Sequence, residues 1–264
     1  MRVARGSAAL LTVAALTGSA CAPALFRPPA GPGSPAPDAA TALDNATAAC
    51  RDVRSLVFIM HLHGRIAGRG IPGALRFDGA ATRDGGLFLD ANANGRQYLE
   101  LRGTPGAASL WLRDGNRLVN APLTDILEAL TGLAIAPDRL LAFMTGCVTW
   151  DRSIVQASRF GRDIRVRTSD AEIVLVTAPA GWRTRWGVSG GLVVDYHEMQ
   201  GLWPRRFTIY PEATAGEDRL TMQIDQRFVN DARASNQELF TPRARPGSVP
   251  MTVEELREAV WRDP

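Results

Sequence analysis

The sequence has 264 residues, and all thirty of its basic residues are arginine, because it contains no lysine. This excludes enzymes that need a catalytic or phosphate-binding lysine, such as Schiff-base aldolases, pyridoxal enzymes, P-loop kinases and Ser-Lys hydrolases. The arginines are interleaved with 27 acidic residues, which leaves a formal charge of +3 and no clustered basic face for nucleic acid. At 45% hydrophobic residues, the chain can bury the core of one large domain or two small ones.

The N-terminus has the pattern of an export signal. Arg2 and Arg5 precede an apolar run over residues 8–16, and small residues then lead to Cys21. This pattern predicts a signal peptide over residues 1–20, since the run is too short to span a bilayer. Cys21 follows Ser-Ala and resembles a bacterial lipobox cysteine, which is acylated and becomes the new N-terminus; cleavage without acylation is the alternative. Without the two leader arginines, 28 arginines face 27 acidic residues, so the exported body is nearly neutral.

Residues 21–49 are predicted to be the lipidated cysteine and a Pro/Ala-rich tether, because such a composition buries too little to fold and stays extended. If Cys21 is acylated, two cysteines remain, Cys50 and Cys147, and export places them in an oxidising compartment. One disulfide between them is the economical interpretation, and two buried free thiols are the alternative. In the chain-entropy model, a loop of this length stabilises the fold by roughly 4–5 kcal/mol.

From Arg54 onward, alternation of apolar and polar residues predicts short strands separated by turn residues. The first, Ser55–Ile66, places Leu56, Phe58 and Met60 on one face and Val57 on the other. The further strands are Gly73–Ala80, Gly86–Ala91, Arg96–Arg102, Ala107–Arg113, Arg117–Asn120, Asp163–Thr168, Glu172–Thr177, Gly181–Trp186, Gly191–Glu198, Arg205–Tyr210 and Arg219–Arg227. Turn-forming Gly, Asn, Asp and Pro between them indicate an antiparallel meander.

Two helices interrupt the meander, at Leu123–Leu133 and at Asp138–Thr145, the latter opened by Pro137. The predicted fold class is mainly β (α+β). It is an incomplete antiparallel barrel or curved sheet of about 11–12 strands, with the two-helix insertion covering its concave face. We assign residues 50–240 to this half-barrel. Residues 241–264 form a C-terminal extension whose short helix follows a capping box at Thr252–Glu255.

Catalytic patterns are weak in this sequence. His61 and His63 share a strand face, but zinc catalysis usually needs three ligands in one place, and His197 lies on a distant strand. The segment around Ser189 matches G-x-S-x-G, yet a strand rather than a helix is expected after it, which indicates a hairpin turn. Asp195 and Glu198 point to opposite faces of their strand. We therefore predict no enzyme activity, no metal and no cofactor.

The remaining feature is the apolar face of the sheet with the apolar sides of the helices. Either these residues form a solid core, or the helices and the sheet leave a gap large enough for acyl chains; strand patterning does not separate the two. The candidate lining residues are Leu56, Phe58, Met60, Leu62, Leu75, Phe77, Leu99, Leu101, Leu110, Leu112, Ile126, Leu130, Leu140, Met144, Leu192, Val194, Phe207 and Ile209.

Several stretches resemble the LolA/LolB-like lipoprotein superfamily over roughly residues 50–262. They are Cys50–Leu56, His63–Arg65, Ile126–Gly132, Ala136–Leu141, Thr145–Cys147, Leu239–Pro242, Pro246–Val249 and Leu256–Arg257. The resemblance implies an incomplete barrel covered by helices, with a hydrophobic cavity that receives lipoprotein acyl chains in transit to the outer membrane. It also implies a lipid-anchored protein on the periplasmic side of the outer membrane, with a periplasmic carrier protein as a partner; Ala22 rather than Asp after Cys21 agrees with that membrane.

One departure from LolB concerns a loop that projects a bulky apolar residue into the membrane. The matching loop here, Asn92–Gly95, offers only Ala93. The leading hypothesis is a non-catalytic lipoprotein that shields lipid or acyl chains. The alternative is a structural or assembly lipoprotein that binds a protein partner through its sheet edge or surface, and a lipid-modifying hydrolase using Ser189 is a third.

Overall fold

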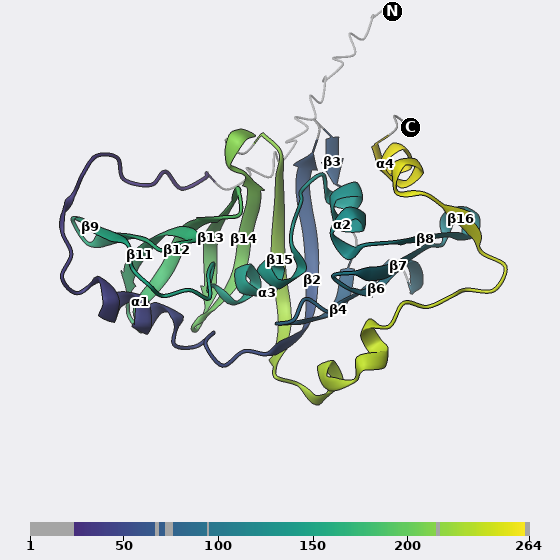
Figure 1. The fold of residues 1–264 in the computed structure, drawn as a ribbon, viewed down its shortest axis with the longest axis horizontal. Helices are drawn as coiled ribbons and strands as arrows, with labels where there is room; N and C mark the ends of the chain where they lie inside the picture. The colour runs from purple at the N-terminus through teal and green to yellow at the C-terminus, as the bar shows by residue number, and fades with distance from the viewer. Residues whose placement is uncertain (1–23, 67–68, 72–75, 94, 215–216, 262–264) are drawn as a thin grey trace, which may run out of the picture.

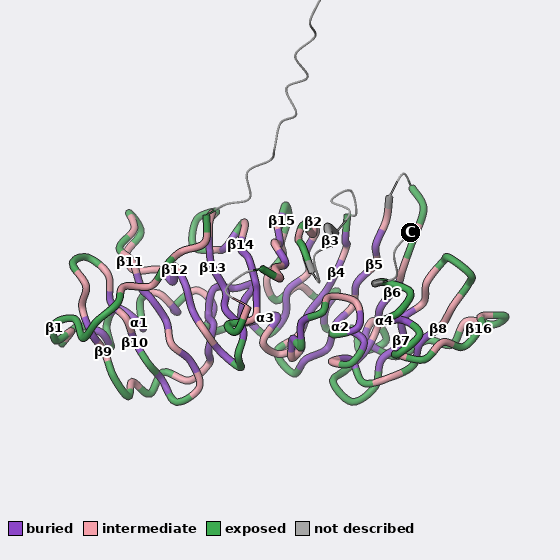
Figure 2. The backbone as a smooth tube through the Cα atoms, turned by 90° about the horizontal axis from the view of Figure 1, so that it is seen from above, coloured by how far each residue is buried: buried purple, intermediate pink, exposed green. Residues whose placement is uncertain are grey.

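A computed structural model describes residues 24–66, 69–71, 76–93, 95–214 and 217–261. Within them the chain forms one large curved sheet, with helices lying inside its curve (Figures 1 and 2). The helices are α1 (Ala39–Thr47), α2 (Leu123–Thr131), α3 (Pro137–Thr145) and α4 (Val253–Trp261). The mainly β, incompletely closed architecture expected from the sequence is confirmed. None of the helices in this part of the chain is long and apolar enough to cross a bilayer.

The sheet consists of two meanders that meet in its middle. The first contains β2 (Ser55–Ile66), β3 (Arg69–Ile71), β4 (Arg76–Thr82), β5 (Leu87–Ala93), β6 (Arg96–Thr104), β7 (Ala107–Leu112) and β8 (Arg117–Ala121). The second contains β9 (Gln156–Phe160), β10 (Asp163–Arg167), β11 (Ala171–Ala178), β12 (Gly181–Ser189), β13 (Leu192–Gln200), β14 (Trp203–Pro211) and β15 (Arg219–Val229). Strand β15 pairs antiparallel with β2 and joins the two meanders.

The ends of the sheet do not meet. β1 (Ser34–Pro35) pairs with β9 at one edge, and β16 (Val249–Met251) pairs parallel with β8 at the other. All twelve strands expected from the sequence are present, although residues 72–75 of the expected strand Gly73–Ala80 lie outside the described residues. β1, β3, β9 and β16 were not expected, because they are short or lack a clear apolar alternation.

Buried apolar side chains of strands such as β2, β6, β13 and β14 are turned toward the helices. Phe58 pairs with Gly79 across β2 and β4, and a Cβ atom at position 79 would lie 2.5 Å from the Phe58 ring. The ring therefore covers the backbone of the glycine, which fixes this register. Helix α3 ends at Thr145 as expected, and α2 ends at Thr131, two residues before the expected Leu133. The glycines that follow, Gly132 and Gly146, adopt the left-handed conformation (φ 65° and 82°) that closes a helix.

The described part of the expected tether packs on the body instead of extending from it. Ala39, Ala42 and Leu43 of α1 are at most 3% exposed and belong to the main core. They are spaced i, i+3, i+4, so they form one apolar stripe of the helix. From the sequence, this helix falls within the expected tether, because the residues before it are rich in proline. Residues 1–23, with the signal peptide and Cys21, lie outside the described residues.

The expected disulfide between Cys50 and Cys147 is present. The two Cα atoms are 6.0 Å apart, and 97 residues separate the cysteines in the chain. The bond ties the segment after α1 to the residue that follows the last turn of α3. It therefore connects the start of the folded chain to one of the helices that cover the concave face.

Candidate functional site

The concave face carries the residues expected to line a lipid cavity. Of the expected set, Leu75 lies outside the described residues. The structure brings the others together in one cluster that also contains α1, α2 and α3 side chains. Thirteen are at most 7% exposed: Leu56, Phe58, Met60, Phe77, Leu101, Leu110, Ile126, Leu140, Met144, Leu192, Val194, Phe207 and Ile209. Leu62, Leu99, Leu112 and Leu130 are partly buried against them.

This layer is packed in the structure. Side chains with almost no water-accessible surface leave no open cavity around them, so the space that these thirteen side chains enclose is filled. Ile126 from α2 and Leu140 and Met144 from α3 fill the gap that the sequence left open as one of two interpretations. A chain-like ligand would enter this layer only if a helix moved.

Helix α3 is held to the body by polar and covalent contacts. The buried hydroxyl of Tyr196 on β13 donates a hydrogen bond to the carbonyl oxygen of Phe143 at 2.9 Å. Arg139, in the first turn, donates to Asp170 at 2.9 Å and to the Ser189 hydroxyl at 2.6 Å. The Cys147 disulfide holds the other end. Three separate contacts therefore fix this helix.

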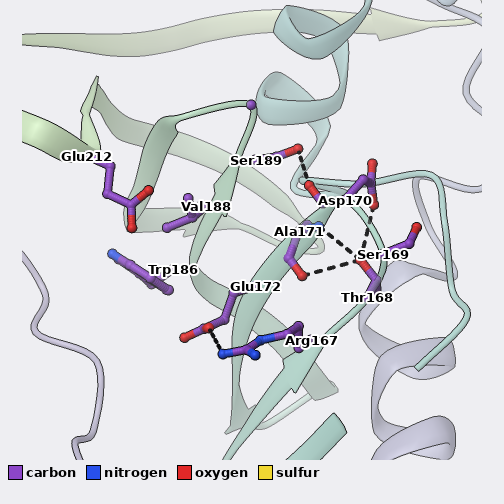
Figure 3. Close-up of a pocket in the computed structure, with 11 residues that line it drawn as sticks. Arg167, Thr168, Ser169, Asp170, Ala171, Glu172, Trp186, Val188, Ser189 and Glu212 are labelled. Atoms are coloured by element: carbon purple, nitrogen blue, oxygen red, sulfur yellow. Dashed lines mark hydrogen bonds and ion pairs between the residues drawn. The ribbon is translucent and has the colours of Figure 1, made fainter. Parts of the chain in front are cut away.

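Asp170 lines a rim pocket of about 310 Å³, seen in Figure 3 between the β10–β11 turn and the β12–β13 hairpin. Thr149 and Thr168 donate to one Asp170 oxygen at 2.6 and 3.1 Å, and Arg139 donates to the other. Burial raises the pKa of Asp170, but these donors outweigh burial, and the net pKa lies below its usual value.

Ser189, the serine of the G-x-S-x-G pattern, lies at the same rim (Figure 3). The chain continues from it through a hairpin into strand β13, as expected, and not into a helix. Its hydroxyl donates to the carbonyl oxygen of Asp170 at 3.0 Å and accepts from Arg139. These partners give Ser189 a role in holding α3, and neither is a general base for a nucleophile.

Helix α2 is attached differently. Leu123, Ile126, Leu127 and Ala129 are buried, and the helix packs on β7, β8 and helix α4. Leu256 of α4 is 0% exposed. These buried apolar side chains hold α2, together with a hydrogen bond from the Leu123 N–H to the Pro105 carbonyl oxygen at 3.2 Å. Helix α3, in contrast, is held by a disulfide and by side-chain hydrogen bonds.

A second apolar feature, the outer groove, lies on the opposite face of the sheet. Its volume is about 540 Å³, within the range of about 300–1,000 Å³ common for small-molecule sites. Its apolar lining includes Val57, Ile59, Phe88, Phe228 and Leu239. The sequence reasoning did not identify this groove, although the second apolar side of the first strand, with Val57 and Ile59, was visible in the alternation.

The three histidines do not come together. His61 on β2 lies 3.1 Å from the Asp225 carboxylate, and His197 on β13 contacts the Thr208 hydroxyl at 2.7 Å. Burial lowers the pKa of His197, and the nearby Asp195 opposes this only in part. Among the described residues, no group of three or more His, Cys, Asp or Glu side chains is placed to hold a metal ion.

No family model and no curated protein matches this chain. Solved structures that are similar to it include a LolA superfamily protein from Nitrosomonas europaea, with 8% identity over 76% of this chain and 96% of that one and a TM-score of 0.47. A DUF1329 family protein from Desulfovibrio piger has 7% identity over 75% and 98% of the two chains (TM-score 0.40). The lipoprotein LppX from Mycobacterium tuberculosis has 11% identity over 75% and 97% (TM-score 0.32).

Proposed function

We propose that this protein is a non-catalytic lipoprotein of the bacterial envelope that binds lipid or acyl chains between helix α2 and the concave face of its sheet. Its role would lie in lipoprotein or lipid localisation to the outer membrane. The observation that carries the proposal is a continuous apolar layer covered by two helices. A disulfide and side-chain hydrogen bonds fix α3, whereas buried apolar side chains and a backbone hydrogen bond from Leu123 hold α2.

The energies involved permit α2 to move. Exposing Leu123, Ile126 and Leu127 would cost roughly 1.5–3 kcal/mol each. One acyl chain of about fifteen methylenes would contribute roughly 12 kcal/mol on burial, at about 0.8 kcal/mol per methylene. A single chain therefore offsets the exposure of the buried leucine and isoleucine side chains of α2. The packed interior corresponds to a ligand-free, closed form in this mechanism.

The envelope location has separate support. The pattern around Cys21 predicts export and acylation, and a disulfide such as Cys50–Cys147 is stable in the periplasm, where thiols are oxidised. A lipid anchor at Cys21 would place the binding layer at the outer membrane.

The test uses the full-length protein purified from bacterial membranes. Native mass spectrometry should show a co-purified lipid beyond the N-terminal modification. A diazirine-bearing fatty acid, added after delipidation, should label peptides of α2, β7 and β8. Absence of both a bound lipid and any photolabel would overturn the proposal. Labelling confined to the outer groove would also overturn the assignment of the site to the concave face.

The outer groove favours a second candidate, a structural or assembly lipoprotein that binds a protein partner. Phe228 is 44% exposed at this groove, and aromatic side chains of this kind are common anchors at interfaces. Crosslinking in cells should then recover one protein partner and no lipid. Phe228→Ser should abolish that crosslink, whereas Val155→Ser, at a residue that is 69% exposed elsewhere, should not.

A further inference from the structure

Residues 24–38, here called the strap, pass from the convex face of the sheet around its β9 edge to helix α1 (Figure 1). The backbone N–H of Phe26 donates to Asp195 on β13 at 2.6 Å. Further along, Arg165 donates to the carbonyl oxygens of Pro29 and Gly31, both at 3.0 Å. The strap is thus hydrogen-bonded to the body at Phe26, Pro29 and Gly31, before it pairs with the β9 edge.

The first contact of the strap is buried. Leu25 and Phe26 pack on a convex-face cluster that consists of Val174, Trp186, Val193 and Tyr210. Arg185 lies over the Phe26 ring, 4.9 Å from its centroid, and forms an ion pair with Asp195. Asp195 is 0% exposed, so loss of the strap would remove a hydrogen-bond donor from a buried carboxylate, which is costly.

The turn around the sheet edge also fits closely. Gly33 has φ +64°, and a Cβ atom there would lie 2.8 Å from the Phe160 ring. Ser34 and Pro35 then pair with Arg159 and Ser158 of β9. The strap covers what would otherwise be an open sheet edge, so its path is set by the edge itself.

We propose that the strap holds the protein body against the membrane in one orientation, with the convex face of β12–β14 beside the bilayer. This rests on the proposed acylation of Cys21. From Cys21 to Phe26 the chain spans at most about 18 Å, at roughly 3.3–3.6 Å per residue. A free tether reaching to Cys50 would instead have a root-mean-square length of about 30 Å and allow every orientation.

The shape of the sheet gives this orientation a measurable consequence. β16 lies nine strands away from β13 along the sheet, which is about 43 Å at about 4.8 Å per strand. Because the sheet curves with its convex face toward the bilayer in this orientation, the distant β16 edge is held away from the bilayer surface. Arg27, which is exposed next to Phe26, supplies a positive charge at the attachment point that suits anionic headgroups.

The experiment uses the full-length, acylated protein in liposomes that contain a headgroup-linked spin label. Acylated Cys21 and the Cys50–Cys147 disulfide do not react with thiol dyes, so one introduced cysteine carries one fluorophore. Arg167→Cys places it on β10 near the strap, and Val249→Cys places it on β16; both residues are exposed. Quenching should be about twofold or more stronger at position 167.

The control variants separate the strap from the anchor. Phe26→Ser should make the quenching at positions 167 and 249 converge while the protein stays bound to liposomes. Phe228→Ser removes another phenylalanine that lies under an arginine, since the Arg233 guanidinium is 4.7 Å from the Phe228 ring centroid. This variant should keep the difference in quenching between positions 167 and 249. Equal quenching at both positions in the bound wild-type protein would overturn the strap proposal. Failure to bind liposomes, with a reactive thiol at Cys21, would contradict the anchor and hence the proposed function.

Discussion

Single polar residues fix the position of α3 in an otherwise apolar layer. Asp170 accepts hydrogen bonds from Thr149, Thr168 and Arg139, and its pKa is lowered as a result. A carboxyl group whose pKa is lower in the folded than in the unfolded state stabilises the fold above its unfolded pKa of about 3.9. That contribution is lost as the pH falls through the folded pKa.

Asp170→Asn should therefore destabilise the protein by about 1–2 kcal/mol at pH 7, because it weakens the charge-assisted bond to Arg139. The difference from the wild type should shrink as the pH falls below about 4. Urea unfolding at pH 7, 5 and 3 measures both effects. Asp44→Asn, at an ion-paired carboxylate whose side chain is 58% exposed, should change stability by less than about 0.5 kcal/mol. If Asp170→Asn lowered the free energy of unfolding by the same amount at pH 3 as at pH 7, the role of the ionised carboxylate would be contradicted.

At the scale of elements, the two covering helices differ in how they are attached. Helix α3 has a disulfide, a tyrosine hydrogen bond and the Arg139 network, whereas α2 has buried apolar side chains against β7, β8 and α4 and a backbone hydrogen bond from Leu123 to Pro105. Helix α4 begins with the expected capping box: Glu255 accepts from the Thr252 N–H at 2.8 Å, and the Glu255 N–H donates to the Thr252 hydroxyl at 3.1 Å. The capped helix α4 packs on α2 and on β8, so it helps to hold α2 in place.

Leu256→Ala should loosen α2 and leave α3 unchanged, because Leu256 is a fully buried residue of α4, and α4 packs on α2. Removal of a buried leucine side chain costs about 2–5 kcal/mol. Hydrogen exchange followed by mass spectrometry should show faster exchange of α2 amides in the variant. Val260→Ala, at the more exposed side of the same helix, is the matched control. Equal acceleration in α2 and α3 would show that the two helices open together.

At the scale of the whole molecule, the Cys50–Cys147 bond closes a 97-residue separation and joins the N-terminal part of the fold to its helical cover. The loop that it closes contains the entire first meander and both inserted helices. Because so much of the chain lies within the loop, the disulfide restricts the unfolded state strongly.

Replacement of both cysteines by alanine should destabilise the protein by roughly 4–5 kcal/mol in the chain-entropy model. Guanidinium unfolding with and without a reductant measures this loss. Reductant should lower the stability of the wild type toward that of the variant and leave the variant unaffected. A Cys21→Ala protein, which keeps the disulfide, should unfold like the wild type. Insensitivity of the wild type to full reduction would contradict the predicted contribution.

The sequence by itself determined the twelve strands, the two inserted helices, the capping box and the cysteine pairing. Alternation, glycine and proline positions and cysteine count are local or countable signals, so these features could be predicted. The tertiary structure decided that α1 and the strap pack on the body, and that the concave layer is filled. It also decided where the outer groove lies. These features depend on contacts such as Phe26 with Asp195, 169 residues apart, and on how side chains from distant segments fill a shared space. Periodicity shows which face of an element is apolar, but not which distant segment packs against that face.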